Sequence, residues 1–100
     1  MTPKQRKQRP VFSGVLSYFP KALMEVAHVS WVGNEQHNPD SPLHWDRSKS
    51  TDEADALMRH LLDHASGKKY DTDGCRHLAK VVWRACALLE KEIESENVIL

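Results

Sequence analysis

The chain of 100 residues carries 14 lysines and arginines against 14 aspartates and glutamates, so its formal net charge at pH 7 is zero. This length supports one domain with a modest core, and the balanced charge provides no field that would attract nucleic acid. No apolar run approaches a membrane span, and the start lacks the apolar segment of a secretory signal. Two cysteines without metal-site spacing suit a reducing compartment, so we expect a cytoplasmic protein without membrane contact.

The N-terminal residues differ in character from the rest of the chain. Residues 1–10 are polar and basic and lie between Pro3 and Pro10, which predicts a flexible basic arm followed by one helical domain over residues 11–100. Residues 11–19 are apolar and are interrupted by Gly14. Their residue types favour a short extended segment that packs over the core.

Three later stretches have helical periodicity, at residues 20–32, 50–66 and 73–94. Pro20 suits a first helical turn and Gly33 a helix end, while Ser50 and Glu53 have the spacing of a capping box. Apolar residues at steps of three and four predict the core residues Leu23, Val26, Leu57, Leu61, Leu78, Val82, Ala85 and Leu89.

Residues 34–49 form a long aperiodic stretch between the first two helices. They contain two prolines, two histidines and Trp45, a composition that predicts an ordered, functional loop. The short link between the second and third helices predicts that these two are antiparallel neighbours. The expected fold is therefore all-α, a small three-helix domain with a long ordered loop between its first two helices.

One candidate site is a metal site built from histidine and carboxylate. His60 and Asp63 are three residues apart on one predicted helix, so both side chains lie on one face, and helix pairing would bring His77 close. Asp73 is a further candidate ligand. The alternative is a surface ion pair between Arg59 and Asp63, with His60 at the edge of the core.

A second candidate site is a phosphate and base site. It would form where the long loop meets the N-terminal halves of the second and third helices, because arginine and helix N-termini favour phosphate. Trp45 is the expected stacking surface for a base, whereas Trp83 lies near the core stripe and is more typical of packing. The predicted nucleotide-binding residues are His44, Trp45, Arg47, Arg59, His60, Arg76, His77 and Arg84.

Several segments of this sequence resemble the phage and prophage domain family described as dATP/dGTP diphosphohydrolase, N-terminal. The resemblance covers about residues 16–90, and it is carried by residues 18–27, 33–38, 44–45, 59–61, 71–79 and 83–85. It implies a helical domain of phage origin, acting in the host cytoplasm, that handles purine nucleotides. The family description also implies a link to all-helical pyrophosphohydrolases that use Mg²⁺.

The residues themselves support binding better than hydrolysis. Magnesium-dependent hydrolysis of nucleoside triphosphates commonly uses an E-E-x-x-E run answered by E-x-x-D, and this sequence contains no such run. Three functions therefore stay open. The chain is a dNTP phosphohydrolase or its nucleotide-recognition half, a non-catalytic oligomeric sponge for cyclic nucleotide or cyclic ADP-ribose immune signals, or a partner-binding phage protein.

Self-association is expected from the small size of the core. A three-helix domain of this length buries little apolar surface, and residues 11–19 and 98–100 are apolar segments that need cover. A homo-oligomer would supply that cover.

Overall fold

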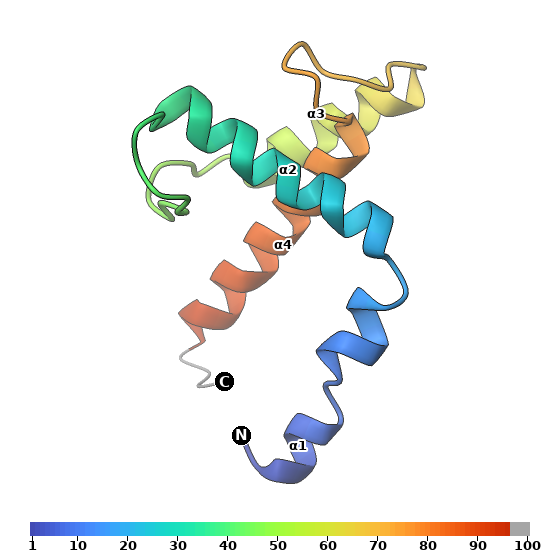
Figure 1. The fold of residues 1–100 in the computed structure, drawn as a ribbon, viewed down its shortest axis with the longest axis vertical. Coiled ribbons are helices and arrows are strands. Elements are labelled where there is room, and N and C mark those ends of the chain that lie inside the picture. The colour runs from blue at the N-terminus through green and yellow to red at the C-terminus, as the bar shows by residue number, and fades with distance from the viewer. Residues whose placement is uncertain (97–100) are drawn as a thin grey trace.

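A computed structural model describes residues 1–96, and every regular element in this range is helical (Figure 1). The three principal helices are α2 (Pro20–His37), α3 (Glu53–Ala65) and α4 (His77–Ser95). A short helix α1 (Pro3–Lys7) and a π-helical turn η1 (Phe12–Leu16) precede them. The prediction of an all-α fold built on three main helices is thus confirmed, with two short helical elements added at the N-terminus.

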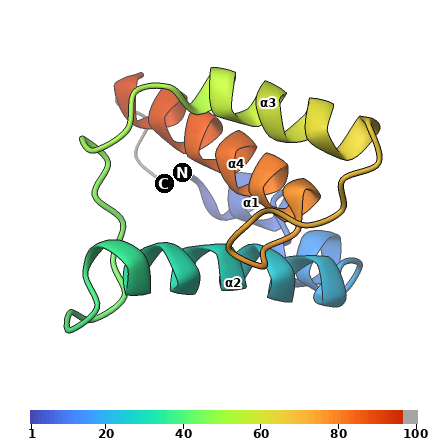
Figure 2. The ribbon, with the colours of Figure 1, turned by 90° about the horizontal axis from the view of Figure 1, so that it is seen from above.

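Helices α3 and α4 run antiparallel side by side, and α2 crosses α4 (Figures 1 and 2). The loop over residues 38–52 leads from the end of α2 to the start of α3 along one end of this arrangement (Figure 2). Because α1 and η1 extend away from the helical body, the radius of gyration is 15.2 Å, against about 13 Å for a compact chain of this length.

The N-terminal segment is helical where we expected extension. Residues 11–19 contain η1, in which the backbone N–H of Ser17 donates to the carbonyl of Phe12 over 2.8 Å. Helix α1 begins with a capping box in which the Thr2 hydroxyl accepts from the Gln5 N–H and the Gln5 side chain accepts from the Thr2 N–H. Local hydrogen bonds therefore satisfy this segment without a partner strand.

Three predicted helix boundaries were wrong: the end of α2 and the starts of α3 and α4. Helix α2 continues past Gly33 to His37, because Gly33 lies in ordinary helical backbone with open space around it and imposes no stop. The predicted capping box at the start of α3 does not form. The Ser50 hydroxyl instead donates to the Asp52 carboxylate over 2.7 Å, and the Glu53 side chain is buried.

Helix α4 begins four residues later than predicted, because a tight turn precedes it. Gly74 adopts a φ of 85°, and the Asp71 N–H donates to the Cys75 carbonyl over 2.8 Å. The carboxylate of Asp73 accepts from the Cys75 N–H over 3.0 Å, so it stabilises this turn and does not cap the helix. The turn holds Asp71 and Asp73 beside the first turns of α4.

The core differs most from the prediction. The buried apolar residues among those described are Ala56, Cys75, Ala79 and Ala87, and they are accompanied by buried Asn34, Glu53, His60 and His77. Of the predicted core residues, Leu23, Val26 and Leu57 are half-buried, but Leu61, Leu78, Val82, Ala85 and Leu89 are exposed. Small alanines allow close approach of the helices, so α4 packs through its mixed polar flank and leaves its most apolar stripe exposed.

This packing leaves much apolar surface uncovered within the described part of the chain. Leu89 on α4 is 58% exposed, and Phe12 on η1 is 73% exposed. Residues 98–100, the other apolar segment in the self-association prediction, lie outside the described range. No helix between residues 1 and 96 has the length and apolar character needed to span a bilayer.

Candidate functional site

A cavity of about 540 Å³ opens between α2, the loop over residues 38–52 and the paired helices α3 and α4. Its volume lies within the range of roughly 300–1,000 Å³ that is typical of small-molecule sites. The polar, charged and aromatic residues that line it include Ser30, Asn34, His37, His44, Trp45, Asp46, Lys49, Ser50, Glu53, His60, Asp73, Lys80, Trp83 and Arg84.

Two tryptophans form an aromatic corner in this cavity. Trp45 of the loop meets Trp83 of α4 edge to face, with ring centroids 5.7 Å apart. The indole Nε1–H of Trp83 donates to the Ser30 hydroxyl of α2 over 2.8 Å, which fixes its ring plane. The guanidinium of Arg47 lies 4.3 Å from the Trp45 ring centroid, a cation–π contact that holds the loop tryptophan in place.

Glu53 contributes a buried carboxylate at the first position of α3. Its Oε2 lies 3.2 Å from the Lys91 ammonium, and its Oε1 lies 3.7 Å from the Arg84 guanidinium. Burial alone would raise the pKa of Glu53, but the contact with the Lys91 ammonium, together with smaller contributions, outweighs burial and lowers it, so this group is an anion at neutral pH. Its Oε1 is buried and accepts no hydrogen bond from any described residue.

Asn34 presents a second buried acceptor in the wall of the same cavity. Its Nδ2 donates to the Ser41 carbonyl of the loop over 3.0 Å, a contact that fixes which end of the amide is the nitrogen. The Oδ1 atom is buried without a hydrogen-bond donor among the described residues. Buried unsatisfied oxygens are uncommon in folded proteins, so two in one cavity indicate a place for donor groups of a ligand.

Lys80 of α4 lies between two carboxylates of the preceding turn. Its Nζ is 2.6 Å from Asp71 and 2.6 Å from Asp73. The Lys80 hydrogen bond lowers the pKa of Asp71 to about 2. Burial would lower the pKa of Lys80, but its two carboxylate partners together raise it, so all three groups are ionised at neutral pH.

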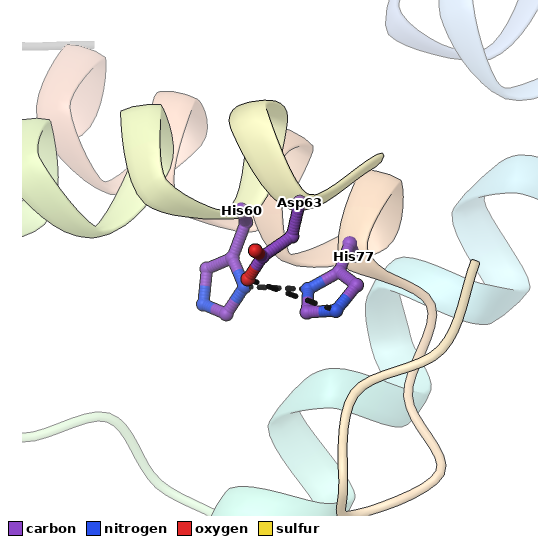
Figure 3. A group of neighbouring side chains, drawn as sticks. All are labelled: His60, Asp63 and His77. Carbon is purple, nitrogen blue, oxygen red and sulfur yellow. Dashed lines mark hydrogen bonds and ion pairs between the residues drawn. The ribbon is translucent and has the colours of Figure 1, made fainter. Parts of the chain in front are cut away.

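His60, Asp63 and His77 form a separate cluster where α3 meets the start of α4 (Figure 3). The Nδ1 atoms of His60 and His77 are 2.9 Å apart, and Nε2 of His77 is 3.9 Å from the Asp63 carboxylate. Both rings are buried, whereas Asp63 is half-buried. Burial lowers the pKa of His60, and the Lys80 charge lowers it further, so this ring is neutral at pH 7.

The structure brings some predicted nucleotide-binding residues together and separates others. His44, Trp45, His60 and Arg84 line the cavity, and so does Asp73, which was predicted as a metal ligand. The remaining predicted residues lie elsewhere: Arg47 bonds Glu94 over 2.8 Å, Arg76 covers the Tyr70 ring, His77 faces His60, and Arg59 is exposed on α3. Asp63 and Asp73 are not members of one ligand cluster.

Sequence reasoning did not identify several important lining residues. Asn34 was interpreted as the start of a loop, and Glu53 as a capping residue, because neither position shows its burial in the local pattern. The spacing of Asp71, Asp73 and Lys80 could have predicted their ion pairs. A lysine about one turn into a helix is well placed to reach acidic residues in the turn that precedes the helix.

Comparison with protein families and with known proteins identifies the chain at the level of its family. The family model described as dATP/dGTP diphosphohydrolase, N-terminal, matches residues 2–98. Neither the curated proteins nor the solved structures gave a match. Because the match spans nearly the whole sequence and agrees with the segments on which the resemblance depends, the chain belongs to the dATP/dGTP diphosphohydrolase N-terminal family.

Proposed function

We propose that the protein binds a purine deoxynucleotide, with the base inside the cavity and the phosphates at its mouth. The observation that carries this proposal is the pair of buried acceptors, Asn34 Oδ1 and Glu53 Oε1, which line one cavity without donors from the described chain. Guanine and adenine present N–H groups on the base edge that would satisfy such oxygens. The family description, which names dATP and dGTP, supports the same class of ligand.

The charges of the cavity favour this orientation of the nucleotide. Lys80 is held by two carboxylates and Arg84 lies near Glu53, so these interior cations are already compensated. Lys49 and His44 belong to the loop side of the cavity and are both exposed. Phosphates would remain hydrated beside these loop residues, while a base would gain stacking from Trp45 or Trp83.

The carboxylates of the site are poorly arranged to bind the Mg²⁺ that the family description implies. Mg²⁺ requires near-octahedral oxygen ligands, usually carboxylates. Here Asp71 and Asp73 share the Lys80 ammonium, and Glu53 contacts Lys91. These carboxylates are thus already paired with lysines, and we derive no hydrolytic step for this chain.

These engaged carboxylates favour a second candidate, binding without turnover. A non-catalytic sponge for cyclic nucleotide or cyclic ADP-ribose signals would use the same aromatic corner and the same acceptors. The two candidates differ in the fate of the ligand. Incubation with dGTP and Mg²⁺, followed by assays for pyrophosphate and phosphate and by recovery of ligand after heat release, separates them. Intact dGTP supports the sponge, and released pyrophosphate supports a hydrolase.

Calorimetry with dGTP, dATP, dCTP and a cyclic dinucleotide, in EDTA, tests binding itself. Glu53→Gln replaces one acceptor oxygen by a donor at constant size, and we expect it to weaken dGTP binding roughly 10- to 100-fold, the scale of a hydrogen bond to a charged group. Glu35→Gln is the control and should have no effect, because Glu35 is exposed and is not among the residues that line the cavity. Absence of purine binding to the intact protein would refute the proposal.

A further inference from the structure

The cluster of His60, Asp63 and His77 is distinct from the aromatic corner of the cavity. His60 and Asp63 extend from one face of α3, and His77 is the first residue of α4 (Figure 3). One ligand atom from each residue lies within 4.8 Å of the other two. Two helices thus place three side chains of metal-binding type close together.

The geometry of the two imidazoles fits a shared ion. Their Nδ1 atoms are 2.9 Å apart. An ion at the usual distance of about 2.0–2.1 Å from each nitrogen would subtend an N–metal–N angle of roughly 90°, and a small separation of the rings would reach a tetrahedral angle. Without an ion the same spacing permits one hydrogen bond, in which only one of the two facing nitrogens carries a proton.

The surroundings of the cluster favour a cation. Both rings are buried, so they are held with little freedom, whereas the half-buried Asp63 leaves a route from solvent. Lys80 is the positive charge that acts most strongly on His60, but Asp71 and Asp73 each lie 2.6 Å from its ammonium and compensate it. Lys68, 3.9 Å from Asp63, is an exposed side chain that can move away.

We propose that His60, Asp63 and His77 bind one divalent transition-metal ion of borderline softness, such as Zn²⁺, Co²⁺ or Ni²⁺. Two imidazole nitrogens and one carboxylate suit these ions, whereas Mg²⁺ and Ca²⁺ prefer oxygen ligands throughout. Water or an added ligand would complete the coordination. Since His60 also lines the cavity, the ion would lie at its edge.

Metal binding to the purified 100-residue chain tests this site without any nucleotide, so the result does not depend on the proposed function. After treatment with a chelator, the protein is titrated with Zn²⁺ by calorimetry and with Co²⁺ by visible absorption. We expect one equivalent to bind, with d–d bands that report nitrogen and oxygen ligands, and no displacement by millimolar Mg²⁺. No binding of Zn²⁺ or Co²⁺ to the folded chain would overturn the proposal.

Variants locate the bound ion. His60→Gln and Asp63→Asn each remove a ligand of the metal ion. Loss of a residue that only hydrogen-bonds to a ligand weakens metal binding roughly 10- to 100-fold, so each of these variants should weaken it by more than that. His64→Gln is the matched control, because His64 is an exposed histidine on the same helix and is not in the cluster. Circular dichroism establishes folding, and the partly exposed Asp63 provides a test even where His60→Gln unfolds the chain. Unchanged affinity in Asp63→Asn and His60→Gln, or equal loss in His64→Gln, would place the ion elsewhere and refute this site.

Discussion

Trp83 and Ser30 connect α4 to α2 through a single hydrogen bond, in which the indole N–H donates to the hydroxyl over 2.8 Å. The residues are 53 positions apart in the sequence, and both line the cavity. The bond therefore fixes one wall of the candidate site as well as the crossing of two helices.

Removal of this hydrogen bond should affect stability and binding together. Trp83→Phe keeps an aromatic ring but deletes the donor, and we expect a loss of about 1 kcal/mol in the free energy of unfolding with weaker purine binding. Denaturant unfolding and calorimetry measure the two effects. Trp31→Phe is the control, because Trp31 is 55% exposed on α2. In a double-mutant cycle, Ser30→Ala should add little to Trp83→Phe; full additivity would show that the bond contributes nothing.

The Lys80 cluster predicts an acid-sensitive fold. The pKa of Asp71 is about 2 in the folded chain, whereas the ordinary value of 3.8 applies to the unfolded chain. Between these two pH values the unfolded chain binds a proton that the folded chain does not, so a falling pH favours unfolding. The stabilisation, about 2 kcal/mol, is complete above pH 3.8 and is lost as the pH falls towards 2.

Unfolding of the wild type and of Asp71→Asn at several pH values measures this contribution. The variant should be less stable than the wild type at about pH 6, and the difference should shrink as the pH falls towards 2. Asp55→Asn, at an exposed position of α3, should show no such convergence. A constant difference between wild type and Asp71→Asn across this range would contradict the predicted ion pair.

The small core predicts an unusual sensitivity to added volume. Ala56 is fully buried where α3 packs on α4, so Ala56→Leu should destabilise the fold by about 1–3 kcal/mol through overpacking. Leu62→Ala, at a position on α3 that is 65% exposed, should change stability by less than about 0.5 kcal/mol. Thermal unfolding compares the two. The reverse order would mean that α3 packs through its other face.

The arginines provide a test of the cavity as the nucleotide site. Arg84 lines the cavity, whereas Arg76 lies over Tyr70 and Arg59 is exposed on α3. Arg84 is already paired with Glu53, so Arg84→Ala acts by changing the wall of the cavity and should weaken dGTP binding by about 0.5–1.5 kcal/mol, whereas Arg6→Ala in the N-terminal arm should have no effect. Losses at Arg59 or Arg76 equal to that at Arg84 would locate the nucleotide outside this cavity, and equal losses at Arg6 would indicate diffuse attraction.

The outer face of α4 predicts self-association. Leu78, Val82 and Leu89 lie along this face and are exposed, and the described helical body buries only small apolar side chains. A second copy would cover the stripe, because a two-fold interface lets one surface pair with itself. Sedimentation should detect an oligomer at micromolar concentration that Leu89→Glu dissociates and Met58→Glu, on α3, leaves intact. A monomeric wild type would exclude this interface.

The helices were predictable from sequence, but their faces were not. Periodicity over α2, α3 and α4 is strong enough to locate each helix within a few residues. Hydropathy predicted that the stripe with Leu78 and Leu89 is the buried face of α4. The helices instead pack through alanines such as Ala79 and Ala87 beside charged groups. A single sequence records which residues are apolar, and it does not record which apolar face has a partner inside the same chain.

The candidate site was predictable only in part, for a related reason. The loop residues His44 and Trp45 stand out because an aperiodic stretch rarely carries them without a contact. Asn34 and Glu53 lie at ordinary positions near helix ends, so their burial depends on how the loop folds back over α2 and α3. Arg59 and Arg76 were predicted from their charge and their proximity to motifs, and neither lines the cavity.

The loop over residues 38–52 forms one side of the cavity, although it takes no part in the main contacts of α4 with α2 and α3. Under the proposed function, substitutions in this loop would alter which molecule the cavity accepts while the helical scaffold keeps its packing. Such a separation permits rapid diversification of ligand preference at low risk to folding. It also makes this loop the natural target for directed evolution of a sensor from so small a chain.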